Sequence, residues 1–156
     1  MQAAEITIHH EFVPGDLGQL IYIHGMQNFA DYGFNHVHEA YCARVAVEFI
    51  LCPEKGRSRA WLAKKEEKVV GSIFIVERPD NQAQLRLLFV DRSARGVGLG
   101  RWLVEESIGY CRAADFDVVY GGRFGSRNFD LRISRVYPQR RKARRGMGEK
   151  QPRNSL

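Results

Sequence analysis

The sequence predicts one α/β domain in the order strand, two helices, three consecutive strands, helix and strand, followed by an atypical C-terminal end. Residues 85–106 carry most of this prediction, because they combine an apolar strand, a glycine-rich turn and an amphipathic helix. Segments before them alternate between helical and strand periodicity. The 156 residues, of which 44% are hydrophobic, suffice for one buried core.

The N-terminal third predicts a strand and two helices. Residues 5–13 alternate and contain β-branched side chains, which favours a strand. Pro14 and Gly15 break it, and Asp16 is the expected N-cap of a helix that continues to about residue 30. After a break at residues 31–34, Asn35 caps the second helix. The expected buried face of that second helix consists of Val37, Tyr41, Val45, Phe49 and Cys52.

The middle of the chain predicts a hairpin and then a central strand. Residues 60–64 and 69–77 read as strands joined by the charged turn 65–68, and residues 78–81 lead into the strand 85–90. A helix follows from about Gly98, and residues 116–120 form a further strand. The expected apolar face of the helix consists of Leu103, Val104, Ile108 and Cys111.

The turn before that helix has the composition of an anion-binding loop. Gly96, Gly98 and Gly100 permit positive φ and let main-chain amides approach an anion, and the helix N-terminus adds unsatisfied N–H groups. A dinucleotide-binding GxGxxG motif would require glycine at position 101, which is Arg101. The pattern Arg95-x-x-Gly98-x-Gly100 therefore favours a diphosphate held by a different kind of loop.

This pattern resembles the coenzyme A motif of the GCN5-related N-acetyltransferases (GNAT). The resemblance extends over about residues 5–120, and its markers include 15–18, 24–25, 32–33, 70–72 and 84–88. These segments look like the acetyltransferase domains that often follow a MarR-type regulator in bacteria. The resemblance implies a GNAT-like central mixed β-sheet flanked by helices.

The family resemblance also implies a site and a reaction. An amine of a small molecule or peptide would attack acetyl-CoA directly, and the loop between the first two helices would place Tyr32 and Phe34 at the acceptor pocket, although both could equally be core residues. The main chain of the central strand would bind the pantetheine arm and the glycine loop the diphosphate. The implied coenzyme-binding residues are Leu88, Phe89, Val90, Arg95, Gly96, Gly98, Leu99, Gly100 and Arg101.

The catalytic residues stay unassigned, because Gln84 stands where many family members carry a glutamate base and an amide cannot act as that base. Glu11, Glu39 or a water molecule are alternatives. Arg86 is a charge in an apolar strand, which would meet an acidic substrate group or pair with a carboxylate. His24 is expected to pack within its helix. No metal site is predicted, because His36 and His38 do not share a helical face.

Composition limits the location and the partners. Cys42, Cys52 and Cys111 form no CxxC pair, which favours a reducing cytoplasm, and neither a secretion signal nor a membrane span is recognisable. The net charge of +6 comes from the C-terminal end. Residues 1–120 carry 13 basic and 16 acidic side chains, whereas residues 121–156 carry 11 and 2.

Residues 1–120 are therefore predicted to be the acetyltransferase-like domain and residues 121–156 a basic C-terminal segment without the family's closing strands. Three interpretations of this segment stay open: a nucleic-acid-binding extension, a disordered end, or the product of a frame change. The corresponding alternatives to an active enzyme are a truncated inactive relative and a nucleic-acid accessory protein. An unpaired last strand would also allow a homodimer by strand exchange.

Overall fold

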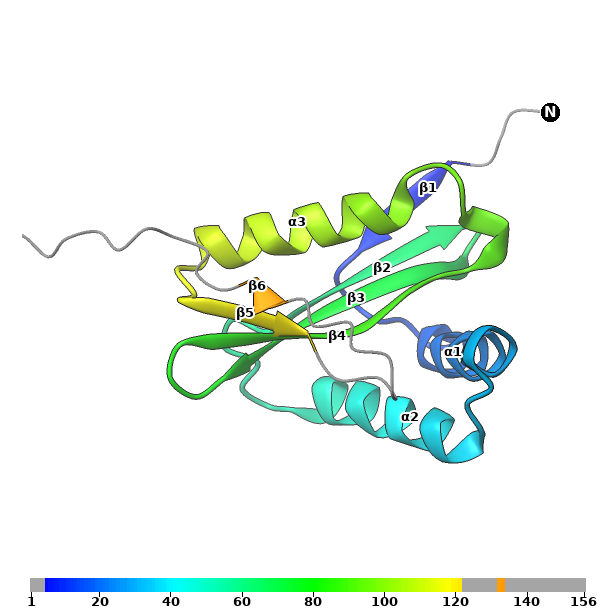
Figure 1. The fold of residues 1–156 in the computed structure, drawn as a ribbon, viewed down its shortest axis with the longest axis horizontal. Coiled ribbons are helices and arrows are strands. Elements are labelled where there is room, and N and C mark those ends of the chain that lie inside the picture. Colours follow the sequence, from blue (N-terminus) through cyan, green and yellow to red (C-terminus); the bar gives the residue numbers. More distant parts are fainter. Residues whose placement is uncertain (1–4, 122–131, 134–156) are drawn as a thin grey trace, which may run out of the picture.

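The computed structural model describes residues 5–121 and 132–133, and these form one six-stranded sheet with helices on both faces (Figure 1). The helices are α1 (Asp16–Tyr32), α2 (His36–Leu51) and α3 (Leu99–Ala113), with a short 3₁₀ turn, η1 (Arg92–Ala94). The predicted fold class and element order are confirmed. The strands are β1 (Ile6–His9), β2 (Arg59–Lys65), β3 (Lys68–Arg78), β4 (Gln82–Val90), β5 (Val118–Gly121) and β6 (Arg132–Ile133).

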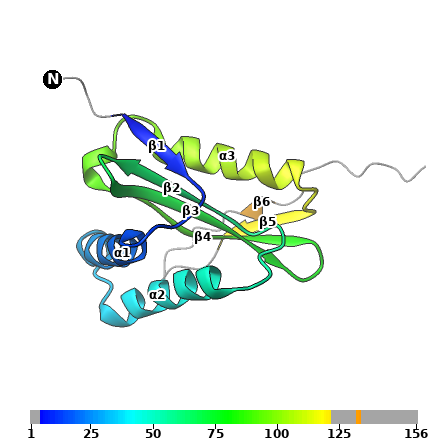
Figure 2. The same ribbon diagram turned by 180° about the vertical axis from the view of Figure 1, so that it is seen from behind.

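The strands lie across the sheet in chain order, from β1 to β6. Every neighbouring pair is antiparallel except β4 and β5, which are parallel. Parallel neighbours need a crossover, and α3 supplies it. Figure 1 shows α3 on one face of the sheet and α1 with α2 on the other, and Figure 2 shows the same arrangement from behind. No helix in the described part of the chain is long and apolar enough to cross a bilayer.

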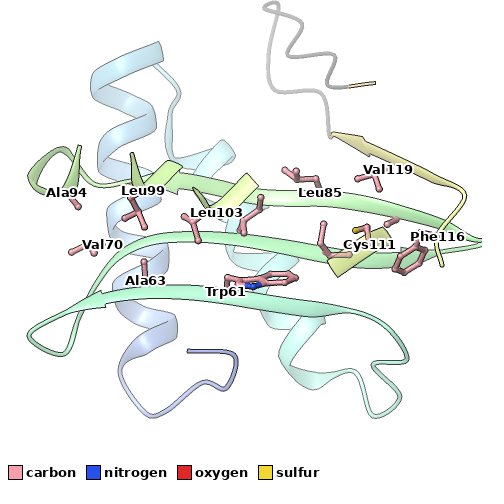
Figure 3. Packing of buried hydrophobic residues seen from close by; sticks show 13 residues of the cluster. Trp61, Ala63, Val70, Leu85, Ala94, Leu99, Leu103, Cys111, Phe116 and Val119 are labelled. Atoms are coloured by element: carbon pink, nitrogen blue, oxygen red, sulfur yellow. The ribbon is translucent and has the colours of Figure 1, made fainter. Parts of the chain in front are cut away.

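Buried apolar side chains pack together on the α3 face of the sheet (Figure 3). Leu99, Leu103 and Cys111 of α3 belong to one buried cluster with side chains from β2, β3, β4 and β5. The polar exception on α3 is Ser107, which is fully buried and whose hydroxyl donates to the Val104 carbonyl at 2.9 Å. The sequence pattern found Leu103 and Cys111 but missed Ser107, because a hydroxyl bonded within its own helix leaves no periodic signal.

The opposite face carries a second apolar cluster together with charged groups. Leu20 of α1 and Cys42 and Phe49 of α2 cover β2, β3 and β4. Asp16 and Lys64 are both buried on this side, and their Oδ1 and Nζ atoms form an ion pair of 2.8 Å. Among the residues that the structure describes, the buried charged side chains therefore lie on this face and not on the α3 face.

Three local predictions near the N-terminus were wrong. The first strand ends at His9, and α1 continues to Tyr32. The N-cap of α1 is Gly15, at φ 99°, while Asp16 is the first helical residue and accepts a hydrogen bond from the Val13 N–H. Asp16 thus closes the preceding turn and binds Lys64, a partner that lies 48 positions further along the chain.

Two of the five residues predicted for the buried face of α2 are buried. Asn35 caps the helix as expected, because its side chain accepts from the Val37 N–H at 3.0 Å. Val45 and Phe49 are buried, but Val37 is exposed. Tyr41 and Cys52 are exposed as well, and Cys42 and Ala46 take their places in the core. Two adjacent helical stripes of α2 are apolar, and only packing against the sheet selects between them.

The C-terminal end of the sheet also differs from the prediction. β5 begins at Val118, since Asp117 donates its N–H to the Asn81 carbonyl and Phe116 packs in the core before the strand starts. β6 pairs with Val119 and Tyr120, so β5 is not an unpaired edge and one closing strand exists. Two residues are too few to give a sequence pattern. The predictions for residues 122–131 and 134–156 lie outside the described residues, and the proposed domain boundary stays a prediction.

Candidate active site

A bulge in β4 is the first feature of the site. Ser72 pairs with Phe89 and Phe74 pairs with Arg86, so Ile73 of β3 faces both Leu87 and Leu88. Leu87 adopts a left-handed conformation at φ 50°, which is rare for a branched apolar side chain. The Ser72 hydroxyl donates to the Leu87 carbonyl at 2.6 Å and fixes the bulge. Bulges interrupt the ladder and turn the strand, often beside active sites.

The main chain after the bulge is the second feature. β5 pairs with β4 only over Gln82 to Leu85 within the described residues. Beyond that point, Leu88 and Phe89 have no described neighbouring strand on their β5 side. Strand N–H and C=O groups without a partner strand can bind an extended ligand as a further strand would.

A glycine loop with the start of α3 is the third feature. Gly96 and Gly98 have φ values of 83° and 81°, and a Cβ atom at either position would meet no atom within 4 Å. Backbone conformation, not space, is therefore the reason for glycine here. Gly98 is the N-cap of α3 and its first turn lacks a side-chain cap, so the first amides of α3 are available to an anion.

These three features surround one open cleft of about 330 Å³. Its volume lies in the range of small-molecule sites. Every predicted coenzyme residue except Arg101 lines it. Leu88, Phe89 and Val90 come from β4, and Arg95, Gly96, Gly98, Leu99 and Gly100 come from the loop and the start of α3.

The α1 helix forms the other wall of the cleft, which the sequence analysis missed. Gln27, Asn28 and Asp31 line the cleft from the C-terminal half of α1. They continue a polar stripe from His24 at helical spacing, and this stripe was the available signal. The Gln27 amide donates to Asp91 Oδ1 at 2.6 Å, which connects α1 to the end of β4.

Arg95 connects the loop to α1. Its guanidinium donates to Asp31 at 2.9 Å, to the Gln27 side-chain oxygen at 3.2 Å and to the Val90 carbonyl at 3.0 Å. Arg92 also binds Asp31, and the two guanidinium groups lower the pKa of that carboxyl. The motif arginine therefore holds the walls of the cleft together.

The other predicted site residues lie at the margin. Arg101 projects to solvent and pairs with Glu105 at 2.7 Å. Tyr32 lines the cleft and is 56% exposed, so core packing does not explain it. Phe34 lies between Tyr32 and His38, with ring centroids 5.6 and 4.4 Å away.

The candidate bases are placed as follows. Gln84 accepts hydrogen bonds from Arg78 and Arg86, Glu11 lines a separate hollow near α2, and the Glu39 side chain packs over Gly25. Neither glutamate lines the cleft. Among the described residues, the carboxylate on its wall is Asp31, which two arginines already bind.

His24 lies directly behind the cleft. It is buried, its ring centroid is 4.5 Å from that of Phe89, and its Nε2 atom makes no hydrogen bond. Burial lowers the pKa of His24 to about 4, although the nearby Leu87 carbonyl opposes this shift. His24 therefore packs within the fold, as predicted, and is neutral at pH 7.

The family assignment agrees with this geometry. The sequence model described as the acetyltransferase (GNAT) family matches residues 24–129, which is more than half of the chain. The chain therefore belongs to the GNAT family of acetyltransferases, and the predicted resemblance is confirmed. No curated protein matches the sequence. The resemblance to domains that follow MarR-type regulators stays a prediction.

Solved structures show the same fold. An acetyltransferase from Streptococcus agalactiae is 28% identical with a TM-score of 0.58, covering 78% of this chain and 73% of that one. A GNAT acetyltransferase from Staphylococcus aureus is 20% identical with a TM-score of 0.64, covering 77% and 74%. A GNAT acetyltransferase from Brucella melitensis, solved in complex with acetyl-CoA, is 16% identical with a TM-score of 0.62, covering 87% and 93%.

Proposed function

We propose that this protein transfers the acetyl group of acetyl-CoA to a primary amine by direct attack. The observation that carries the proposal is the cleft in which the bulged end of β4 meets the glycine loop and the N-terminus of α3. An elongated ligand with a diphosphate at one end and amide groups along its length is complementary to this pair of features. The acetyl-CoA complex of the Brucella melitensis relative supports the choice of ligand.

Two parts of the cleft would bind different parts of the coenzyme. The main-chain amides of Gly96 to Gly100 would hold the diphosphate, because their N–H groups and the α3 dipole favour negative charge. The main chain of Leu88, Phe89 and Val90 would hydrogen-bond the pantetheine arm. Arg101 would add charge at the rim only by leaving Glu105. Tyr32 and Phe34 would border the acceptor pocket.

The reaction itself needs few protein groups. The neutral amine nitrogen bonds to the thioester carbonyl carbon, the carbon–sulfur bond breaks, and coenzyme A leaves as the thiolate. A backbone N–H among residues 88–90 would stabilise the developing oxyanion. Because Asp31 is engaged by Arg92 and Arg95, the proton of the amine would pass to water, and the rate would rise with pH as the amine becomes neutral.

Two variants of Gly98 test the diphosphate assignment. Gly98→Glu and Gly98→Gln impose the same backbone strain at φ 81°, and they differ only in the negative charge placed at the loop. We expect saturable binding of acetyl-CoA to the unaltered protein by calorimetry, and at least ten-fold weaker binding to Gly98→Glu than to Gly98→Gln. Equal affinity of the two variants would place the diphosphate elsewhere.

A further inference from the structure

Arg86 is a buried cation in the middle of β4. Its side chain lies on the α2 side of the sheet and the residue is 7% exposed. One guanidinium nitrogen donates to the Gln84 side-chain oxygen at 3.1 Å, and another donates to the Tyr41 hydroxyl at 2.7 Å. The guanidinium carbon also lies 5.4 Å from the centroid of the Tyr41 ring. All of these partners are neutral.

No carboxylate of the residues that the structure describes lies within 4.0 Å of Arg86. The buried Lys64, by contrast, has Asp16 at 2.8 Å. Burying a cation without an anion is unfavourable, and an arginine fork matches a carboxylate through two parallel hydrogen bonds. Within the described part of the chain, Arg86 therefore has the hydrogen-bonding groups to bind a carboxylate and no carboxylate partner.

Arg86 lines a cavity of about 400 Å³ between α2 and the β3–β4 hairpin. Val45, Phe49 and Val76 give this cavity apolar walls. Two of its carboxylates are already engaged, since Glu48 pairs with Arg44 and Glu77 pairs with Arg57. A third, Glu54, is exposed. Lys55, Arg78 and Arg86 also line the cavity, and none of them has an ion pair with a described carboxylate. Lys55 and Arg78 are exposed, so Arg86 is the buried cation on its apolar wall.

This cavity and the coenzyme cleft are lined by neighbouring residues of β4. Arg86 precedes the bulge at Leu87, and Leu88 to Val90 on the other side of the bulge line the cleft. The Cα atoms of Arg86 and Leu88 can lie at most about 7 Å apart, the reach of two extended residues. A molecule whose carboxylate is held at Arg86 would extend an amine, a few ångströms from that carboxylate, toward residues 88–90, among which the oxyanion donor is proposed.

We propose that Arg86 binds the carboxylate of the acceptor and that the acceptor is an amino acid with an apolar side chain. This inference rests on the proposed acetyl transfer. The amine nitrogen bonds to the acetyl carbon, coenzyme A leaves as its thiolate, and the amine proton passes to water, so the products are an N-acetylamino acid and coenzyme A. The Tyr41 hydroxyl and the Gln84 amide oxygen accept hydrogen bonds from the guanidinium and position it.

The first experiment compares three acceptors on the unaltered protein. Phenylalanine, phenylalaninamide and phenethylamine share the amine and the apolar body but differ at the carboxylate. Release of the coenzyme A thiol from acetyl-CoA gives kcat/KM for each acceptor, calculated on the concentration of its neutral amine. We expect kcat/KM to be at least ten-fold higher for phenylalanine than for the other two. An equal or reversed preference overturns the proposal.

The second experiment removes the cation. Arg86→Gln should abolish the carboxylate preference while leaving the affinity for acetyl-CoA unchanged, and Arg86→Lys should retain part of the preference. Arg78→Gln is the matched control, because Arg78 lines the same cavity and also donates to Gln84 but is exposed. If Arg86→Gln leaves the carboxylate preference unchanged, or if Arg78→Gln lowers it as much, the proposal is wrong.

A binding measurement separates failure of this inference from failure of the proposed function. Calorimetry of phenylalanine against the protein saturated with coenzyme A needs no turnover. If phenylalanine binds in a way that depends on Arg86 but no thiol is released from acetyl-CoA, the carboxylate site is supported and the proposed acetyl transfer is wrong. Acetyl-CoA binding and amine acetylation without any carboxylate preference would retain the enzyme and reject the site.

Discussion

The two faces of the sheet bury different kinds of side chain. Toward α3, the buried cluster is apolar, and Ser107 satisfies its hydroxyl within its own helix. Toward α1 and α2, the buried side chains include His24, Arg86 and the Asp16–Lys64 pair. Buried polar groups cost stability unless they are fully paired. The comparison indicates that apolar burial stabilises the α3 face, while the opposite face holds buried polar and charged side chains at a cost in stability.

The largest effect is expected when the buried ion pair of the α1 and α2 face is broken at Lys64. Lys64→Met leaves Asp16 as a buried unpaired anion and should lower the free energy of unfolding by about 3–5 kcal/mol. The double variant Asp16→Asn with Lys64→Met should recover at least half of this loss. Urea unfolding measures both. The matched control is Arg44→Met, which breaks an exposed pair with Glu48 and should cost less than about 1 kcal/mol. A loss below that value for Lys64→Met would contradict the role of the pair.

The next largest effect is expected from a substitution at Leu103, which tests the packing of the α3 face. The side chain is fully buried between α3 and the sheet, so Leu103→Ala should lower the free energy of unfolding by about 2–5 kcal/mol through lost burial and a cavity. Glu106→Ala on the exposed side of the same helix is the control, with an expected change within about 0.5 kcal/mol. Similar losses in urea unfolding for the two variants would show that α3 does not pack as described.

A smaller effect, seen as a pH dependence, distinguishes the two faces at His24. Its pKa is about 4 in the folded protein and 6.5 unfolded, so between these values the unfolded chain binds the extra proton. Above pH 6.5 protonation of His24 does not affect the free energy of unfolding. As the pH drops to 4, preferential protonation of the unfolded chain lowers the free energy of unfolding by about 2–3 kcal/mol. His24→Gln should remove this part of the slope in urea unfolding at pH 7 and 4.5. Parallel pH dependence of the variant and the unaltered protein would show that His24 is not buried in its neutral form.

The local elements were predictable because their causes are local. The hairpin, the strand entering the glycine loop and the start of α3 at Leu99 follow from periodicity and from residues that permit positive φ. The wrong predictions concern residues whose role or burial depends on partners far away in the sequence. Asp16 was expected to cap a helix and instead binds Lys64. The predicted face of α2 included the exposed Tyr41, whereas packing against the sheet buries Cys42.

The sequence by itself determined the element order and the coenzyme-type loop, since both depend on residues within a few positions of one another. Tertiary structure alone decided that Asp31 and Gln27 of α1 bind Arg95 across the cleft. It also decided that Leu87 bulges and that Arg86 is buried without a carboxylate from the described residues. These features depend on which faces of separate elements come together, and no single stretch of sequence records that packing.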